Sequence, residues 1–428
     1  MTGLVLRDAR VEDAATTSDI VMEAGRITAV LPAGTPHPPG ATDPQGAHET
    51  IDCAGRVVLP GFVEAHIHPD KAHLDGLRAP RGATLADAIA VTLDLKREFT
   101  HDDVRDRSRR VVESAILNGT TTLRAHPDVD PVAGTLGVEV LVELREQYRD
   151  FIDIQIVAFP QEGILRAPGT DKLLRLALAA GADVVGGCAY QEDSVEDCRR
   201  HVDLVLDLAA EHGIPADLHA DFADDAGDPR QSMAEYVAEA TRRRGLGGRV
   251  TLGHMTSLAG RPRRERMAVM RELAAAGVAV VPLPATDLHL GGRSDTRAVR
   301  RGVAPVRELW EAGVVTATAS NNIRNAFTPY GTGDLLDIAL LLAQTGHLSG
   351  PADLRRVLRM VTYDAARVVG IAENYGVRVG AAADLVVLDT DRYDDIVLDR
   401  PERTHVIKAG RVVARTTRTR QLVNAPAA

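Results

Sequence analysis

The chain has 428 residues, with 50 Lys and Arg against 60 Asp and Glu, so its formal net charge is −10. A hydrophobic content of 45% with 26% charged residues is ordinary for a folded, soluble protein with a large core. No apolar run reaches the roughly 18 residues of a membrane span, and the charged start gives no export signal, so we expect a cytoplasmic protein. The acidic balance argues against a nucleic-acid partner.

Cysteine and lysine are both scarce. Cys53, Cys188 and Cys198 form no CxxC pair, which argues against a disulfide framework and against a thiolate zinc site. The lysines are Lys71, Lys96, Lys172 and Lys408, and the other basic residues are arginines. We therefore expect a lysine in this chain to have a specific role more often than to be an ordinary solvent-exposed residue.

Both ends of the chain are rich in short strands. Runs such as LVLRDARV and DIVMEAGRITAV, and later ADLVVLD and HVIKAGRVVARTTR, alternate with turn residues. A loop rich in Pro, Gly and Ala covers residues 31–46. We predict one small β-sandwich domain built from residues 1–58 and 376–428, interrupted by a large domain of residues 59–375.

The middle of the chain alternates short apolar or β-branched runs with longer segments of helical periodicity, several of which end in glycine. This pattern is typical of βα units, and eight of them predict an α/β fold of the (β/α)8 TIM-barrel type. A doubly wound open sheet is the alternative, but no GxGxxG follows the first strand. The strand candidates are VVLPGFVEAHIH, TTLRAHPDV, IQIVAFPQEG, ADVVGGCAY, PADLHADF, VTLGHMT, AVVPLPATD and VVTATASNN.

Polar residues collect at the ends of these predicted strands, where barrel enzymes place their working groups. They are His66, His68, His126, Gln161, His219, Asp221, His254, Asp287, His289, Asn321 and Asn322. His66 and His68 are two apart on one strand, so both imidazoles point to the same face and can bind one metal ion. His219 would add a third ligand, and such a site keeps an open position for water. Half-buried packing is the plainer interpretation of an HxH pair alone.

Several motifs resemble the amidohydrolase superfamily. They are PGFVEAHIHPDK, HADFADD, GHMTS and GAAADLVVLD, and the segments ADVVG, FPQEGIL and RRGV are similar to its cytosine deaminase-like branch. The similarity runs in order from Leu59 to Asp389. It implies a (β/α)8 barrel with a small β-sandwich, and one divalent metal, zinc or iron or otherwise manganese, that activates water for hydrolysis. The strand-four segment lacks the lysine of two-metal members.

The resemblance assigns roles to several positions of this chain. His66, His68 and His219 match the metal-binding histidines, His254 matches the histidine that contacts the water or substrate, and Gln161 matches a glutamine that binds an amide-like substrate edge. Phe222 stands where cytosine deaminases carry a glutamate that shuttles protons. Asn321 stands where the superfamily has an aspartate that binds metal and accepts a proton, and Asn322 replaces a second aspartate.

These replacements change the chemistry that we expect. Asparagine at 321 offers a neutral oxygen to the metal and no base, and Phe222 can stack on a flat substrate but cannot shuttle a proton. General acid or base catalysis typically contributes about 10² to 10⁴ in rate, so deamination of cytosine itself is not expected. His254 is then the expected base. The other candidates are carboxylates after strand five, Asp221, Asp224 and Asp225.

Further residues are expected around the substrate. Arg324, Phe327 and Tyr330 follow the eighth predicted strand and should shape the site, with Arg324 a candidate for an anionic group. His126 and His289 are candidates for supporting or substrate contacts. Asp70 and Lys71 follow the HxH pair directly, either as an ion pair between neighbours or as functional groups.

The sequence favours hydrolysis of a non-peptide C–N bond in a small cyclic or planar amide or amidine. Two alternatives remain: a non-hydrolytic isomerase, lyase or cyclase on the same scaffold, and an inactive binding protein. The retained histidines and Gln161 argue against the inactive protein. We expect a small-molecule substrate and no membrane partner, and the sequence leaves a homo-oligomer open.

Overall fold

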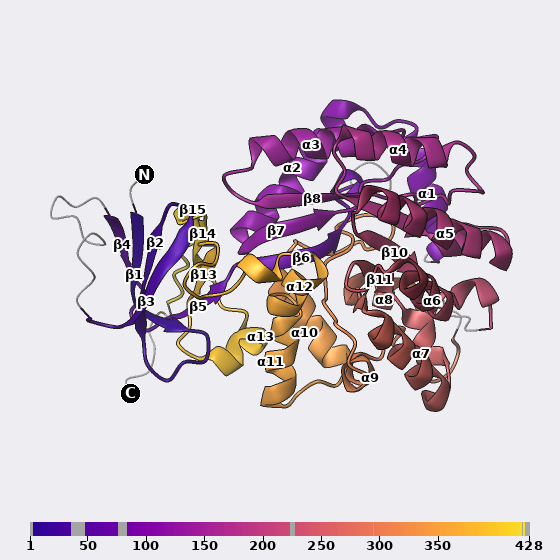
Figure 1. Ribbon diagram of the computed structural model, residues 1–428. Helices are drawn as coiled ribbons and strands as arrows, with labels where there is room; N and C mark the ends of the chain where they lie inside the picture. The colour runs from indigo at the N-terminus through magenta and orange to yellow at the C-terminus, as the bar shows by residue number, and fades with distance from the viewer. Residues whose placement is uncertain are drawn as a thin grey trace. The chain divides into compact units, whose positions relative to one another are not determined.

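The computed structural model describes residues 3–35, 48–75, 84–222, 227–293, 295–421 and 423, so most of the loop at residues 31–46 lies outside the described residues. The chain divides into two compact units. One consists of Met1–Gly61 and Gly376–Ala428, and the other is Phe62–Tyr375. A barrel-type domain is thus inserted into a small sheet domain made from both ends of the chain (Figure 1).

The smaller unit contains a mixed sheet in the order β15-β14-β13-β5-β1-β2-β3, with β4 paired to β1. Its buried core collects the inward-facing residues of these strands, among them Leu6, Ile20, Val58 and Val387. The strands are β1 (Gly3–Val11), β2 (Ser18–Glu23), β3 (Arg26–Pro32), β4 (His48–Asp52), β5 (Val57–Pro60), β13 (Leu385–Leu388), β14 (Arg403–Lys408) and β15 (Arg411–Arg415).

The first predicted barrel strand is in fact two strands. Val57–Pro60 forms β5 and pairs with β1 and β13, whereas Phe62–Ile67 forms β6 and pairs with β7 in the other sheet. Pro60 and Gly61 separate them, because proline cannot donate a ladder hydrogen bond and glycine permits a bend. The predicted strand VVLPGFVEAHIH is apolar on both sides of Pro60 and Gly61, so the apolar pattern did not show where β5 ends and β6 begins.

The larger unit is built on seven parallel strands in the described part of the chain, in the order β12-β11-β10-β9-β8-β7-β6. Figure 1 shows helices around this sheet, as the alternating pattern predicted. Gly186 in β9 permits close approach to β8, since a Cβ there would lie 2.7 Å from the carbonyl oxygen of Ala158. The strands are β6 (Phe62–Ile67), β7 (Thr120–Ala125), β8 (Asp153–Ala158), β9 (Val184–Cys188), β10 (Ala216–Ala220), β11 (Val250–His254) and β12 (Val278–Val281).

The eighth predicted strand, VVTATASNN, is not a regular strand in the structure. It makes isolated parallel bridges, Thr316 to Val280 of β12 on one side and Asn321 to Ile67 of β6 on the other. The segment therefore lies between the last and first strands and joins them without a full ladder. The TIM-barrel prediction is confirmed, with seven regular strands and this irregular closure.

Helices begin and end where the sequence carries cap residues. Thr84 forms a capping box with Asp87 at the start of α1, and Gly181, Gly213 and Gly277 end α4, α5 and α7 in the left-handed conformation, as predicted. The α-helices are α1 (Leu85–Lys96), α2 (His101–Leu117), α3 (Leu136–Gln147), α4 (Thr170–Ala180), α5 (Val195–His212), α6 (Ala234–Arg244), α7 (Arg263–Ala276), α8 (Pro284–Leu290), α9 (Val306–Glu311), α10 (Leu335–Thr345), α11 (Pro351–Arg359), α12 (Tyr363–Val368) and α13 (Ile396–Asp399). The 3-10 helices are η1 (Pro69–Lys71), η2 (Ala189–Gln191), η3 (Pro229–Gln231), η4 (Thr256–Gly260), η5 (Ala372–Asn374) and η6 (Tyr393–Asp395).

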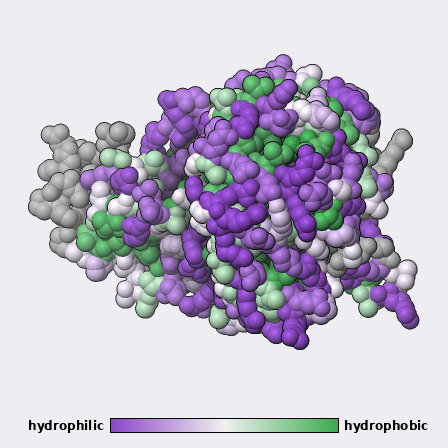
Figure 2. Space-filling view, turned by 45° about the vertical axis from the view of Figure 1, so that its right-hand side comes forward, coloured by the Kyte–Doolittle hydropathy of each residue, from purple (hydrophilic) through white to green (hydrophobic). Residues whose placement is uncertain are grey.

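The surface in Figure 2 is mainly hydrophilic, with apolar side chains gathered in limited areas. Within the residues that the structure describes, no helix combines the length and the apolar character needed to cross a membrane.

Candidate metal and catalytic site

Three histidines from two strands meet inside the barrel unit. His66 lies on β6, His68 follows its last residue, and His219 lies on β10. One ring nitrogen of each lies within 4.8 Å of the others, and the Nε2 atoms of His66 and His219 are 2.8 Å apart. All are buried. The structure thus brings together the histidines that the sequence predicted as metal ligands.

The protonation of these histidines suits metal binding. Burial, together with the neighbouring imidazoles, holds the pKa of His66 and of His219 well below the usual range. Burial also lowers the pKa of His68, helped by the Lys71 ammonium. His68 Nδ1 donates to the carbonyl oxygen of His126 at 2.7 Å, which leaves the Nε2 lone pair for a ligand. Neutral imidazoles are the form that a divalent ion requires, and the tautomer of His68 is fixed as well.

Asn321 is held beside these histidines by its backbone. The backbone N–H of Asn321 donates to the backbone carbonyl oxygen of His66 at 2.9 Å. The backbone N–H of His68 donates to the backbone carbonyl oxygen of Asn321 at 2.8 Å. Its φ is 59°, in the left-handed region. Within the described residues, both atoms of its buried side-chain amide lack hydrogen-bond partners. A buried amide oxygen without a partner, on a residue whose backbone is hydrogen-bonded to His66 and His68, is a group that a divalent cation can bind.

A second group of potential ligands, His66, His126 and Asp217, is a poorer metal site. The rings of His66 and His126 are stacked with centroids 3.7 Å apart and an interplanar angle of 25°, so their in-plane lone pairs do not converge on one ion. Asp217 Oδ2 already pairs with Arg124 at 2.9 Å. We interpret His126 and Asp217 as residues that hold the candidate metal ligands in place rather than as metal ligands themselves.

His254, at the end of β11, also has its Nδ1 held by an oxygen atom, as His68 does. Its Nδ1 lies 2.7 Å from Asp287 Oδ1 on α8, so Nδ1–H donates to the carboxylate and Nε2 is the ring nitrogen left for other contacts. The ring of Phe222 stacks on His254 at 3.9 Å with an interplanar angle of 10°. The sequence predicted Phe222 against the substrate, whereas in the structure one of its faces covers this histidine.

Asp221, a predicted alternative base, has a structural partner instead. Its carboxylate accepts from the N–H groups of Met233 at 2.7 Å and Ala234 at 3.3 Å, where α6 begins. Burial raises its pKa to about 6. The other two alternatives, Asp224 and Asp225, lie outside the described residues.

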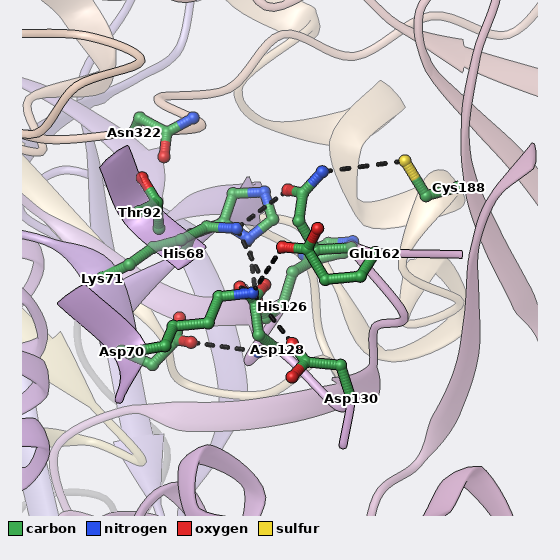
Figure 3. Close-up of polar contacts among 12 residues, drawn as sticks. His68, Asp70, Lys71, Thr92, His126, Asp128, Asp130, Glu162, Cys188 and Asn322 are labelled. Carbon is green, nitrogen blue, oxygen red and sulfur yellow. Dashed lines mark hydrogen bonds and ion pairs between the residues drawn. The ribbon is translucent and has the colours of Figure 1, made fainter. Parts of the chain in front are cut away.

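Gln161 belongs to a buried network of charges that the sequence did not predict. Lys71 Nζ donates to Gln161 Oε1 at 3.0 Å and to Asp128 Oδ1 at 2.8 Å. The other oxygen of Asp128 lies 2.6 Å from Lys96 Nζ on α1. Figure 3 shows Lys71 and the Asp128 carboxylate beside His68. Lys71 therefore pairs with a residue 57 positions away rather than with its neighbour Asp70, and the only signal for it was the scarcity of lysine.

The remaining predicted residues lie around this centre or at the surface. Phe327 is buried with its ring centroid 5.3 Å from Lys71 Nζ. Arg324 is half exposed, and its guanidinium pairs with Asp75 at 2.6 Å. The exposed Tyr330 contacts the ring of His289. The thiol of Cys188 is buried, and burial raises its pKa.

Glu192 holds the segment that carries Gln161. Its carboxylate accepts from His201 Nδ1 at 2.7 Å and from the N–H groups of Ile164 and Arg166 at 2.7 and 2.8 Å. Burial raises the pKa of this carboxyl, but the hydrogen bonds outweigh burial and bring the pKa below its usual value. The carboxylate is the form that stabilises the fold.

Replacement of Glu192 by glutamine is expected to destabilise the fold by about 1.5–3 kcal/mol at pH 7. A glutamate whose pKa is lower in the folded than in the unfolded protein stabilises the fold at pH values above its unfolded pKa, about 4.3. This stabilisation is lost as the pH falls through the folded pKa. The difference between native protein and variant should therefore shrink below about pH 4. Urea unfolding followed by Trp310 fluorescence measures it, with the exposed Glu196→Gln as control. A difference independent of pH would contradict the assignment.

Comparison with known proteins identifies the family. The sequence model of the amidohydrolase family matches residues 49–414. N-isopropylammelide isopropyl amidohydrolase of Pseudomonas sp. (strain ADP) is 35% identical over 377 residues, which cover 86% of this chain and 88% of that protein. Pterin deaminase of Rhizobium rhizogenes is 32% identical over 404 residues, covering 93% and 88%.

A solved structure shows the same architecture. The 5-methylcytosine deaminase of Klebsiella pneumoniae, liganded with 5-fluorocytosine, superposes with a TM-score of 0.91 at 30% identity and covers 98% of this chain and 99% of its own. The chain belongs to the amidohydrolase family. The family and fold predicted from the motifs are confirmed.

Proposed function

We propose that the protein hydrolyses a non-peptide C–N bond of a small planar nitrogen ring, with His66, His68 and His219 holding one divalent metal ion. The convergence of these three neutral imidazoles beside Asn321 carries the proposal. The similar proteins support it, because their names give an ammelide, a pterin and a cytosine derivative as compounds that they act on or bind. Zinc or iron suits this set of ligands best, and manganese less well.

When bound, the metal would supply a Lewis acid that lowers the pKa of a water molecule. The chain supplies the rest. His254, with Nδ1–H held by Asp287, presents Nε2 as the nitrogen that would accept a proton and return it to the leaving amine. Asn321 offers its amide oxygen beside the histidines, and the buried surroundings exclude bulk water.

The function is tested with full-length protein reconstituted with zinc, iron or manganese. N-isopropylammelide, pterin, 5-methylcytosine and cytosine are offered, and release of ammonia or isopropylamine is measured. Turnover in water labelled with ¹⁸O should place one labelled oxygen in the product. A product without label would refute hydrolysis and favour the isomerase, lyase or cyclase alternative.

Metal removal gives an independent measurement. Dialysis against a chelator should abolish turnover and lower the unfolding temperature, because a ligand that binds only the folded state stabilises it. Zinc added back should restore both. If native protein binds none of the three metals and its unfolding temperature does not respond to them, the proposal fails.

A further inference from the structure

A buried glutamate joins the first barrel strand to the irregular segment that closes the barrel. Glu64 lies on β6, two residues before His66, and is 1% exposed. Its Oε1 accepts from the backbone N–H of Ser320 at 3.1 Å and from that of His66 at 3.3 Å. Its Oε2 lies 3.3 Å from the same Ser320 nitrogen. Both carboxyl oxygens therefore meet the backbone N–H of the residue before Asn321.

Ser320 depends on this side chain because its segment lacks a full ladder. The segment bridges to β12 at Thr316 and to β6 at Asn321, and Ser320 lies between the two bridges. Ser320 is buried, so its N–H needs an acceptor inside the protein. The Glu64 carboxyl supplies the acceptor that a backbone carbonyl supplies in a regular sheet. The strand that carries His66 is also held by its pairing with β7, so Ser320 depends on Glu64 more than His66 does.

The contact bears on Asn321 through its backbone conformation. Asn321 has a φ of 59°, a left-handed conformation that persists only where surrounding contacts hold it. Its own N–H and carbonyl are bonded to His66 and His68, and Glu64 holds the residue before it. Without the Glu64 acceptor, the buried Ser320 N–H is unpaired, and a shift of the segment toward another acceptor would move the Asn321 side chain. The two polar atoms of that side chain have no hydrogen-bond partner among the described residues.

We propose that Glu64 is a positioning residue for the metal site. Its carboxyl group holds Ser320 and so keeps Asn321 in the left-handed conformation from which the side-chain amide binds the metal ion. The inference rests on the proposed function, because it needs the metal ion that the three histidines would hold. Groups that hold a metal ligand in place typically contribute about 10- to 100-fold to metal affinity.

Zinc affinity of the full-length protein tests the proposal, measured by competition with a chromophoric chelator. Glu64→Met keeps the length of the side chain but removes both acceptors, and it should weaken zinc binding about tenfold or more. Glu64→Gln keeps one acceptor oxygen and should stay within about threefold of the native protein. Glu196→Met makes the same substitution as the first variant at an exposed position of α5 and should change nothing. Circular dichroism shows that each variant is folded. If Glu64→Met does not fold, Glu64→Asp, whose carboxyl is one methylene shorter, replaces it with the same expectation.

A double variant shows whether Glu64 acts through Asn321. In an Asn321→Ala background the amide is gone, and Glu64→Met should weaken zinc binding by less than about twofold further. An equal loss in both backgrounds would overturn the inference, because Glu64 would then act on the histidines or on the fold as a whole. Unchanged zinc affinity of Glu64→Met in the native background would overturn it too.

Hydrogen exchange gives a readout that needs no metal. In metal-free protein, the backbone amide of Ser320 should exchange at least about tenfold faster in Glu64→Met than in the native protein, whereas Glu64→Gln should stay close to it. Equal exchange in the native protein and Glu64→Met would overturn the inference and leave the proposed function intact. The predicted coupling in zinc affinity with no amine released from any ring would leave the inference standing and overturn hydrolysis. A native protein that binds no zinc would overturn both.

Discussion

Replacement of Lys96 by methionine is expected to lower the free energy of unfolding of the barrel unit by about 3–5 kcal/mol. Lys96 is buried at the end of α1, and its ammonium lies 2.6 Å from Asp128, 2.8 Å from Asp130 and 3.0 Å from Glu162. Burial alone would lower the pKa of this lysine, but the three carboxylates raise it. Without the ammonium, the carboxylates repel one another in a buried site.

Lys172→Met on α4 is the matched control, because it makes the same substitution at an exposed lysine. It should change the free energy of unfolding by no more than about 0.5 kcal/mol. Urea unfolding followed by the fluorescence of Trp310, the single tryptophan and a residue of the barrel unit, measures both variants. Equal unfolding midpoints for Lys96→Met and Lys172→Met would show that the buried charges do not stabilise the fold.

Lys96→Met should also reduce activity through Gln161. Asp128 links Lys96 to Lys71, and Lys71 fixes the orientation of the Gln161 amide. A loosened Gln161 should raise the KM of a planar nitrogen ring more than it lowers kcat, because we expect Gln161 to contact the ring rather than the reacting bond.

The fold was predictable wherever a regular sheet follows a regular pattern. Apolar runs marked β7 to β12, and terminal glycines marked the ends of α4, α5 and α7. The segment around Thr316 has the same alternation as a strand but forms only single bridges to β12 and β6. Alternation reports which face is buried, and it does not report how many ladder hydrogen bonds a neighbour can offer.

The histidines of the site were predictable because their place in the fold follows from strand ends. The local backbone was not: Asp221, His254 and Asn321 all have positive φ, although none is a glycine. These conformations are held by surrounding contacts, such as the pair of backbone hydrogen bonds around Asn321.

The charged network could not be read from the sequence because its partners are distant in the chain. Lys71 and Asp128 are 57 residues apart, and Lys71 and Gln161 are 90 apart. The neighbour of Lys71, Asp70, instead accepts from the N–H of Asp128 at 3.0 Å. Side-chain pairing of this kind depends on the tertiary fold, and only the scarcity of lysine singled out Lys71.

Asn321→Asp is the second change from which we expect a large effect. Its backbone is hydrogen-bonded to His66 and His68, and its side-chain amide atoms make no hydrogen bond among the described residues. An aspartate there adds a negative charge next to the neutral imidazoles without a change of size. We therefore expect about tenfold tighter binding of zinc or more. Competition with a chromophoric chelator measures the dissociation constant, and the exposed Asn374→Asp, the matched control, should leave it unchanged.

The same substitution also adds a base. If proton transfer limits turnover, the rate of ring hydrolysis should rise by about 10² or more, within the range that general acid and base groups contribute. Unchanged zinc affinity would mean that residue 321 does not reach the metal. Tighter zinc binding with unchanged turnover would mean that His254, with its proton held by Asp287, already carries the base function. Asparagine at this position would then set the metal affinity rather than the rate.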